Sequence, residues 1–113
     1  MGYYHSTYFA YGVHIPTDSS AWEEEERITE VLKPLKDRCP DVRTLSAGDY
    51  DRNMLFLVTE STEIDLGDYG RTSSATAEQH AAWDAQLAAA VEALGYGDRR
   101  LEAAGWLCVP DLS

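Results

Sequence analysis

The stretch that decides the fold is VRTLSAGDYDRNMLFLVT, residues 42–59. It contains two short extended runs, Val42–Gly48 and Met54–Thr59, separated by a polar turn that is rich in Asp and Asn. Two such runs around such a turn predict a β-hairpin. The core of the second run, Met54–Val58, is hydrophobic without interruption. This pattern is typical of a strand that is covered on both faces.

Two further runs predict strands nearer the ends of the chain. Residues 7–15, TYFAYGVHI, are aromatic and β-branched with little charge, and Pro16 ends them. Apolar side chains fall on both alternating sets of positions, so we expect this strand also to be central. Residues 105–109, GWLCV, predict a short last strand that Pro110 stops.

The segment AWEEEERITEVLKPLKDR, residues 21–38, has the spacing of an amphipathic helix. Four glutamates fill its first turns and three bases fill its last turns, and both placements complement the helix dipole. Pro34 should kink this helix or end its regular part near Lys33. Its apolar stripe consists of Ile28, Val31, Leu32 and Leu35.

A second helix is predicted in TAEQHAAWDAQLAAAVEALG, residues 76–95. Thr76 and Gln79 form a capping-box pair at its start, and Gly95 is the expected C-cap. Trp83 and Leu87 begin an apolar face that continues at the same spacing to Leu94.

The elements therefore follow the order β-α-β-β-α-β, which resembles the split β-α-β, or ferredoxin-like, topology. We expect an α+β sandwich: a four-stranded antiparallel sheet with two helices on one face. In that topology the strands lie in the order last, first, third, second, so both doubly apolar strands are central. The chain, residues 1–113, is predicted to be a single domain with a long polar loop at residues 60–75. An α+β sandwich with another strand order is the alternative, and the topology alone assigns no function.

The composition excludes several classes of partner. The 113 residues carry twenty acids and nine bases, a formal net charge of −11. Direct nucleic-acid binding needs a surplus of Lys and Arg, and so does attachment to an anionic membrane. The balance instead favours a basic protein surface as partner. The prevalence of Arg among the bases, together with abundant Ala, is typical of a GC-rich bacterial or phage gene.

The sequence predicts a cytoplasmic protein. Its start, MGYYHSTYF, has neither the basic nor the long apolar segment of a signal peptide. No run approaches the roughly 18 apolar residues of a membrane span. The two cysteines, Cys39 and Cys108, are distant in sequence and fit free thiols in a reducing compartment.

The hairpin turn superficially matches a calcium-binding loop, with acids or amides at Asp49, Asp51 and Asn53 and a glutamate at Glu60. The sixth position of such a loop must be glycine, but here it is Met54. The second half of the match also has the pattern of a strand, which cannot wrap an ion. We therefore expect a solvated turn and no metal site.

Few residues predict catalysis, and the sequence favours an interaction protein over an enzyme. His14 lies in the first strand and Cys108 in the last, and a thiol beside an imidazole is the start of a nucleophilic pair. A lone cysteine on an edge strand is more often a small apolar side chain. His80 falls near Trp83 and Leu87 on the helix face, so we expect a satisfied core histidine. No histidine or cysteine spacing predicts a zinc site, and no cofactor is expected.

The acidic clusters are the strongest functional signal once the fold is considered. The first helix should begin at the end of the sheet that also holds the hairpin turn. Seven acids would gather there against Arg27 and Arg52, a local balance of −5. The predicted partner-binding residues are Asp18, Glu23, Glu24, Glu25, Glu26, Asp49 and Asp51. A field of this kind speeds encounter with a basic surface, so the leading hypothesis is a small interaction or inhibitor protein. The alternative is that acids gather at helix starts and turns for dipole and solubility reasons.

Two other functions are compatible with the sequence. One is a ferredoxin-like homodimer with an aromatic pocket that binds or transforms a small ligand, lined by Tyr8, Tyr11, His14 and Trp106. The other is a regulatory domain whose partner orders the polar segment 60–75.

Overall fold

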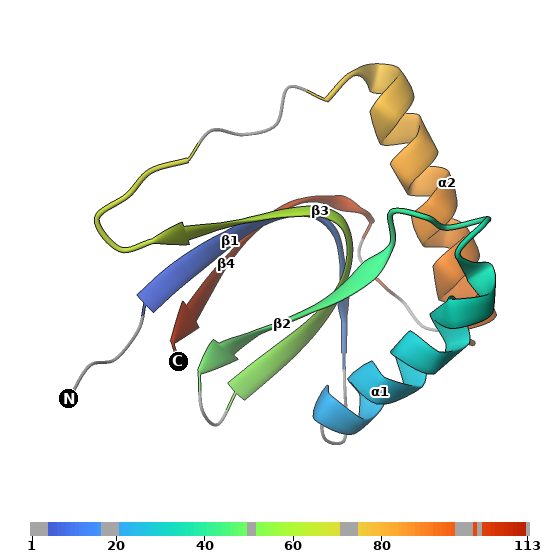
Figure 1. Ribbon diagram of the computed structural model, residues 1–113, viewed down its shortest axis with the longest axis horizontal. Coiled ribbons are helices and arrows are strands. Elements are labelled where there is room, and N and C mark those ends of the chain that lie inside the picture. Colours follow the sequence, from blue (N-terminus) through green and yellow to red (C-terminus); the bar gives the residue numbers. More distant parts are fainter. Residues whose placement is uncertain are drawn as a thin grey trace.

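The computed structural model describes residues 5–16, 21–49, 52–70, 75–96, 101 and 103–112, with backbone alone at a few element ends. An antiparallel sheet carries two helices (Figure 1). The elements are β1 (His5–Ile15), α1 (Ala21–Leu32), η1 (Lys33–Leu35), β2 (Arg43–Asp49), β3 (Arg52–Asp65), α2 (Ala77–Ala93) and β4 (Gly105–Leu112). The α+β class and the order β-α-β-β-α-β are as the sequence predicts. Within the described residues, no helix is long and apolar enough to span a bilayer.

The four strands form one sheet in the order β2-β3-β1-β4, and every neighbouring pair is antiparallel. The two strands that are apolar on both faces, β1 and β3, are therefore the central ones, as predicted. Their register shifts between Tyr11 and Gly12, where β3 accommodates the additional residue Thr59 as a bulge.

The larger core lies between the sheet and the helices. Tyr11, Val13 and Ile15 of β1 and Leu55 and Leu57 of β3 point toward this layer. The helices cover them, and the buried contacts come from Ile28, Cys39, Trp83, Leu87, Ala90, Leu94 and Tyr96. Because α1 and α2 contribute to the same buried cluster, both pack on the same face of the sheet.

The opposite face of the sheet is also buried, although neither helix covers it. Phe56 and Val58 of β3 pack there against Ala10, Ala47 and Val109, and all five are at most 5% exposed. Figure 1 shows the cause: the strands bend into an arch, with the helices outside it. The edge strands β2 and β4 approach each other across the hollow side, where the Gly48 amide donates to Asp111 Oδ1 at 2.9 Å. The curl lets the sheet enclose a second, smaller core.

The helix ends follow the predicted chemistry. Pro34 lies within η1, the single 3₁₀ turn that succeeds α1 at Lys33, so proline does end the regular helix there. The Thr76 hydroxyl accepts a hydrogen bond from the Gln79 amide at 3.1 Å and caps α2. Gly95 follows α2 with φ of 81°, as expected of a helix-terminating glycine.

Two boundaries differ from the sequence prediction. The segment 60–75 is not loop throughout, because β3 continues to Asp65 by pairing Ser61–Asp65 with Ala10–Ser6 of β1. Backbone hydrogen bonds to β1 hold this end of the strand. Its polar side chains give no indication in the sequence that it is a strand. Pro110 does not stop β4 either, since it pairs with Thr7 and the strand continues to Leu112. An edge strand tolerates a residue without an N–H.

Candidate functional site

The exposed face of α1 carries a large aromatic side chain beside uncompensated carboxylates. Trp22, at the start of the helix, is 66% exposed and borders a shallow hollow of about 340 Å³ with Glu25, Glu26, Thr29 and Glu30. The carboxylates of Glu25 and Glu26 make no hydrogen bond or ion pair with any other residue that the structure describes. Exposed tryptophan is costly in water and is enriched where proteins contact one another.

Glu24 differs from its neighbours because it is engaged within the fold. It receives a hydrogen bond from the Tyr96 hydroxyl and an ion pair from Arg27 at 2.6 Å. Arg27 also donates to the Leu94 carbonyl and to Tyr96. Burial, followed by the hydrogen bond to Glu24, raises the pKa of Tyr96. Glu24 thus ties α1 to the end of α2 and is a structural residue more than a surface ligand.

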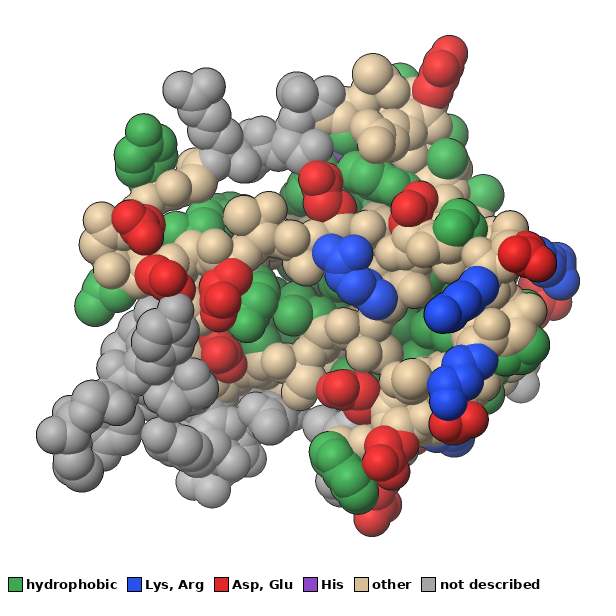
Figure 2. All heavy atoms as spheres, in the orientation of Figure 1, with side chains coloured by type: hydrophobic (Ala, Val, Ile, Leu, Met, Phe, Trp, Pro, Cys, Tyr) green, Lys and Arg blue, Asp and Glu red, His purple; other side chains and the backbone are tan. Residues whose placement is uncertain are grey.

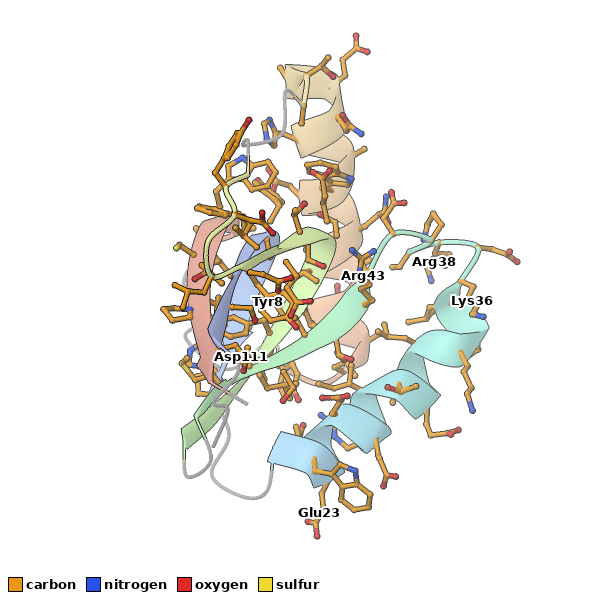
Figure 3. The ribbon with its side chains drawn as sticks, turned by 60° about the vertical axis from the view of Figure 1, so that its left-hand side comes forward. Tyr8, Glu23, Lys36, Arg38, Arg43 and Asp111 are labelled. Carbon is orange, nitrogen blue, oxygen red and sulfur yellow. The ribbon has the colours of Figure 1, made fainter. Side chains whose placement is uncertain are left out.

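The segment that follows α1 on the same side of the molecule is basic. A groove of about 650 Å³ runs between the end of α1 and the edge of β2. Its charged lining comes from Lys33, Lys36 and Arg43, and its apolar lining from Leu32, Cys39, Pro40 and Val42. Figure 2 shows basic side chains gathered on this side of the molecule, and Figure 3 shows Lys36, Arg38 and Arg43 around the end of α1. In a chain with net charge −11 this is a local reversal of sign.

The predicted acidic end is only partly described. The start of α1 and the β2–β3 hairpin lie at the same end of the molecule in Figure 1, and Glu23 projects from that end in Figure 3. Asp49 ends β2, but its side chain is not described. Asp18 and Asp51 lie outside the described residues.

The four residues of the predicted aromatic pocket do not meet, and this prediction is wrong. Tyr8 and His14 lie on the hollow face of the sheet, where Tyr8 packs on the smaller core and His14 stands 5.3 Å from the Phe56 ring. Tyr11 and Trp106 lie on the helix face, with ring centroids 5.3 Å apart. The alternation of side chains along β1 separates position 8 from position 11.

Tyr11 instead belongs to an aromatic cluster under the start of α2. Its ring lies 5.1 to 5.3 Å from those of His80, Trp83 and Trp106, and its hydroxyl donates to Asp84 Oδ1 at 2.6 Å. Burial, followed by this hydrogen bond, raises the pKa of Tyr11 to about 12. Trp106 Nε1 donates to His80 Nε2 at 3.2 Å, so His80 is the satisfied histidine that the sequence predicts. The cluster is packed ring against ring and acts as a cover for the core.

On the hollow face of the sheet, Tyr8 lies among polar side chains. The hydroxyls of Tyr8 and Ser6 both donate to Glu63 Oε2, at 2.9 and 3.0 Å. Burial, then the bond to Glu63 and the charges of Glu63, Asp111 and Asp65, raise the pKa of Tyr8 to about 12. Figure 3 shows Tyr8 and Asp111 on this side of the sheet.

The nucleophilic pair considered from the sequence does not form. Cys108 is exposed and pairs with Phe9, whereas the β1–β4 ladder ends at Gly12 before it reaches His14. The other cysteine, Cys39, is buried with its thiol 3.5 Å from the Gln86 carbonyl. Both cysteines are free thiols, as expected.

A second exposed apolar site lies just after β3. Leu66 and Tyr69 are 84% and 86% exposed, beside Asp65 and Asp68. These residues belong to the predicted polar segment 60–75, so an aromatic and acidic combination occurs there as well.

Comparisons with protein-family models, with curated proteins and with solved structures found no match. Within the described residues, no group of three or more His, Cys, Asp or Glu could hold a metal ion. The sequence prediction missed Trp22 and the basic groove. The α-helical part of this side could be predicted, since Trp22 and Thr29 are seven residues apart, but Lys36 follows the 3₁₀ turn at Pro34 and its place depends on the fold.

Proposed function

We propose that this chain is a small protein-interaction or inhibitor protein that engages a basic protein surface through the acidic start of α1. The observation that carries the proposal is Trp22, which is 66% exposed beside Glu25 and Glu26, whose carboxylates have no ion pair within the described part of the chain. An aromatic anchor supplies most of the affinity in such an interface, while surrounding charges set orientation and speed of encounter.

The same reasoning identifies which acids would act. Glu24 is held by Arg27 and Tyr96, so its removal would disturb the fold as well as any partner. Glu25 and Glu26 have no such internal role for their carboxylates and are the appropriate positions to change. Two charges removed from the α1 face can be compared with two removed from exposed positions on α2, Glu78 and Glu92.

The test is capture of partners from a host lysate at low and high salt with three forms of the chain. Wild type should retain a basic protein at low salt and lose it at high salt. Glu25→Gln with Glu26→Gln should weaken capture and flatten its salt dependence, and Trp22→Ala should weaken capture at every salt concentration. Glu78→Gln with Glu92→Gln should behave as wild type. If both double variants lose capture equally, the partner responds to the overall charge of the chain and not to the start of α1. If neither double variant loses capture, the proposal is wrong.

The turn after β3 offers a second location for the same function. Leu66 and Tyr69 are both more exposed than Trp22, and Asp65 and Asp68 are adjacent to them in sequence. Tyr69→Ala distinguishes the two surfaces in the same capture experiment. If it abolishes binding while Trp22→Ala does not, the partner docks on segment 60–75.

We further propose the ferredoxin-like topology, a cytoplasmic location and a bacterial or phage origin for this chain. The strand order β2-β3-β1-β4 supports the topology, while the arch that brings β2 and β4 together departs from an open, flat sandwich. The free thiols support a reducing compartment.

A further inference from the structure

The acidic start of α1 and the basic segment that follows α1 lie on one exposed side of the molecule. Thr29 lines both the hollow beside Trp22 and the groove beside Lys36, so one continuous face joins them. Along the sequence, Trp22 and Lys36 lie seven residues on either side of Thr29, and Glu25 and Lys33 lie four residues on either side. When this side is laid antiparallel on itself, Trp22 lies opposite Lys36 and Glu25 lies opposite Lys33, whereas Glu26 lies opposite Leu32.

We propose that two copies of this chain pair through α1, antiparallel, about a two-fold axis that passes next to Thr29. Trp22 of each copy then enters the groove of the other, and Glu25 of each faces Lys33 of the other, which pairs with Glu30 of its own chain at 2.9 Å through exposed side chains. This inference rests on the proposed function, because it uses the same acidic start of α1 and names the basic surface that receives it. A two-fold interface of this kind uses every contact twice.

The groove suits a tryptophan ring. Its apolar lining includes Leu32, Pro40 and Val42, and its cationic lining includes Lys36 and Arg43. A cation close to an indole face adds to the gain from removing the ring from water. Exposed ion pairs contribute little by themselves, so Trp22 is the anchor and the charges fix the direction of the pairing.

The net charge decides which experiment is informative. Each copy carries −11, so two copies repel one another while the α1 faces attract. Salt screens both the overall repulsion and the attraction between the faces, so dimer affinity can rise or fall with salt concentration and does not test the proposal. Disulfide trapping and charge exchange do not have this ambiguity.

The first test traps the axis. In a Cys108→Ser background, Thr29→Cys should form an intermolecular disulfide on mild oxidation, because the two-fold brings that position next to its own copy. Glu78→Cys is the matched control because it places an exposed thiol on α2, outside the paired side, and leaves Trp22 and the groove intact. It should not cross-link. Equal cross-linking of both variants, or of neither, contradicts the proposed axis.

The second test exchanges charge between copies, with association measured by sedimentation of the full chain. Glu25→Lys with Glu26→Lys gives an α1 face that is basic at both ends, and Lys33→Glu with Lys36→Glu gives one that is acidic at both ends. Each variant alone should self-associate at least ten-fold more weakly than wild type. Their equimolar mixture should form a heterodimer at least as tight as the wild-type dimer. Thermal unfolding of each variant verifies that it is folded. Thr29→Arg places two positive charges next to each other across the axis. It should abolish association although the acidic and basic residues on both sides of Thr29 are unchanged.

The outcomes separate the two proposals. Wild type that stays monomeric up to about 1 mM, near the weakest affinity of practical interest, overturns the dimer. A failure of the mixture to associate overturns it as well. If that monomer still captures a basic protein through Glu25 and Glu26, the proposed function stands and the partner is another protein. If the dimer forms but capture does not depend on these residues, the α1 face serves self-association alone.

Discussion

At the scale of single residues, Gly12 has no room for a side chain. It stands at the register shift between β1 and β3, and a Cβ there would lie 2.0 Å from the Leu57 carbonyl oxygen and 2.8 Å from Val58 Cα. Both obstacles are backbone atoms, so no side chain can move aside. The central sheet therefore depends on the absence of a side chain at this point.

We expect Gly12→Ala to destabilise the protein by about 3 kcal/mol, the upper part of the usual range for overpacking. Chemical denaturation followed by circular dichroism measures the loss. Gly105, its direct partner on β4, is the control because a Cβ there meets no atom within 4 Å. Gly105→Ala should be close to neutral, and equal losses in the two variants would contradict the steric explanation.

Tyr8, Tyr11 and Tyr96 each have a raised pKa and so make the stability of the fold depend on alkaline pH. Burial and carboxylate hydrogen bonds raise the pKa of Tyr8 and of Tyr11 from 10.0 to about 12. The native state thus holds these protons more tightly than the unfolded chain does. The resulting stabilisation is complete below pH 10 and is lost as the pH rises toward 12.

We expect stability to fall between pH 10 and pH 12, together with the appearance of tyrosinate absorbance. Tyr11→Phe should flatten part of that fall because it removes one phenol that titrates only on unfolding. Tyr69→Phe, at an 86% exposed position, should leave the curve unchanged. A Tyr11→Phe curve as steep as that of wild type would show that burial of this phenol is not linked to folding.

Single residues were predictable from sequence where a local rule governs them. His80 lies on the apolar face of α2 by helical spacing alone, and its contacts with Trp83 follow from that spacing. The prediction of one pocket that contains both Tyr8 and Tyr11 was wrong because side chains alternate along a strand, so positions 8 and 11 lie on opposite faces. Glu24 could not be separated from Glu25 by pattern, since its role depends on Tyr96 at the far end of α2.

At the scale of elements, the start of α2 is set by one side-chain cap. The Thr76 hydroxyl accepts from the Gln79 amide at 3.1 Å, and without it one more N–H of the first turn would lack a partner in the protein. The cap therefore fixes where the helix begins.

We expect Thr76→Ala to lower the free energy of unfolding by about 1 kcal/mol, the usual loss for a threonine N-cap. Thr76→Ser retains the accepting oxygen and should lose much less. Thermal unfolding of the three proteins provides the measurement. If serine and alanine are equally destabilising, the methyl group rather than the hydrogen bond is responsible.

Element boundaries were predictable where a residue acts on its own backbone. Pro34 ended α1 and Gly95 ended α2 at the expected places, since each changes the local backbone directly. The ends of β3 and β4 were not, because pairing with a distant strand decides them. Glu63 continues β3 only because Tyr8 lies opposite. Pro110 remains within β4 because the edge position removes the need for its N–H.

At the scale of the whole molecule, the arch of the sheet is held by a contact between its two edges. The carboxylate of Asp111 on β4 accepts the Gly48 amide of β2 at 2.9 Å. This bond closes the mouth of the hollow over Phe56 and Val58, which no helix covers. The second core therefore depends on the edges staying together.

We expect Asp111→Ala to cost about 1–3 kcal/mol, as for an acceptor removed from a partly buried amide. It should also increase the binding of a fluorescent hydrophobic dye, because the hollow face opens. Asp111→Asn keeps an accepting oxygen and should retain most of the stability. Dye binding that is unchanged in Asp111→Ala would mean that the curl is held by the strands themselves.

The general plan of the molecule was predictable because doubly apolar strands must be central, and β1 and β3 are. The arch was not, since no local pattern signals that two edges will meet. The basic groove escaped prediction for the same reason: it is assembled from the end of α1 and the edge of β2, which are joined only in the folded chain. The acidic start of α1 was visible because its residues are consecutive.

The pairing of β1 with β4 sets an order of events during synthesis. Gly12 and its neighbours on β1 emerge from the ribosome well before their partners in Gly105–Leu112. Until then one side of β1 lacks a neighbour, and the aromatic cover supplied by Trp106 is missing. A nascent chain halted before β4 has emerged should therefore be a substrate for chaperones and proteases, and the native sheet should appear only once β4 is free to pair.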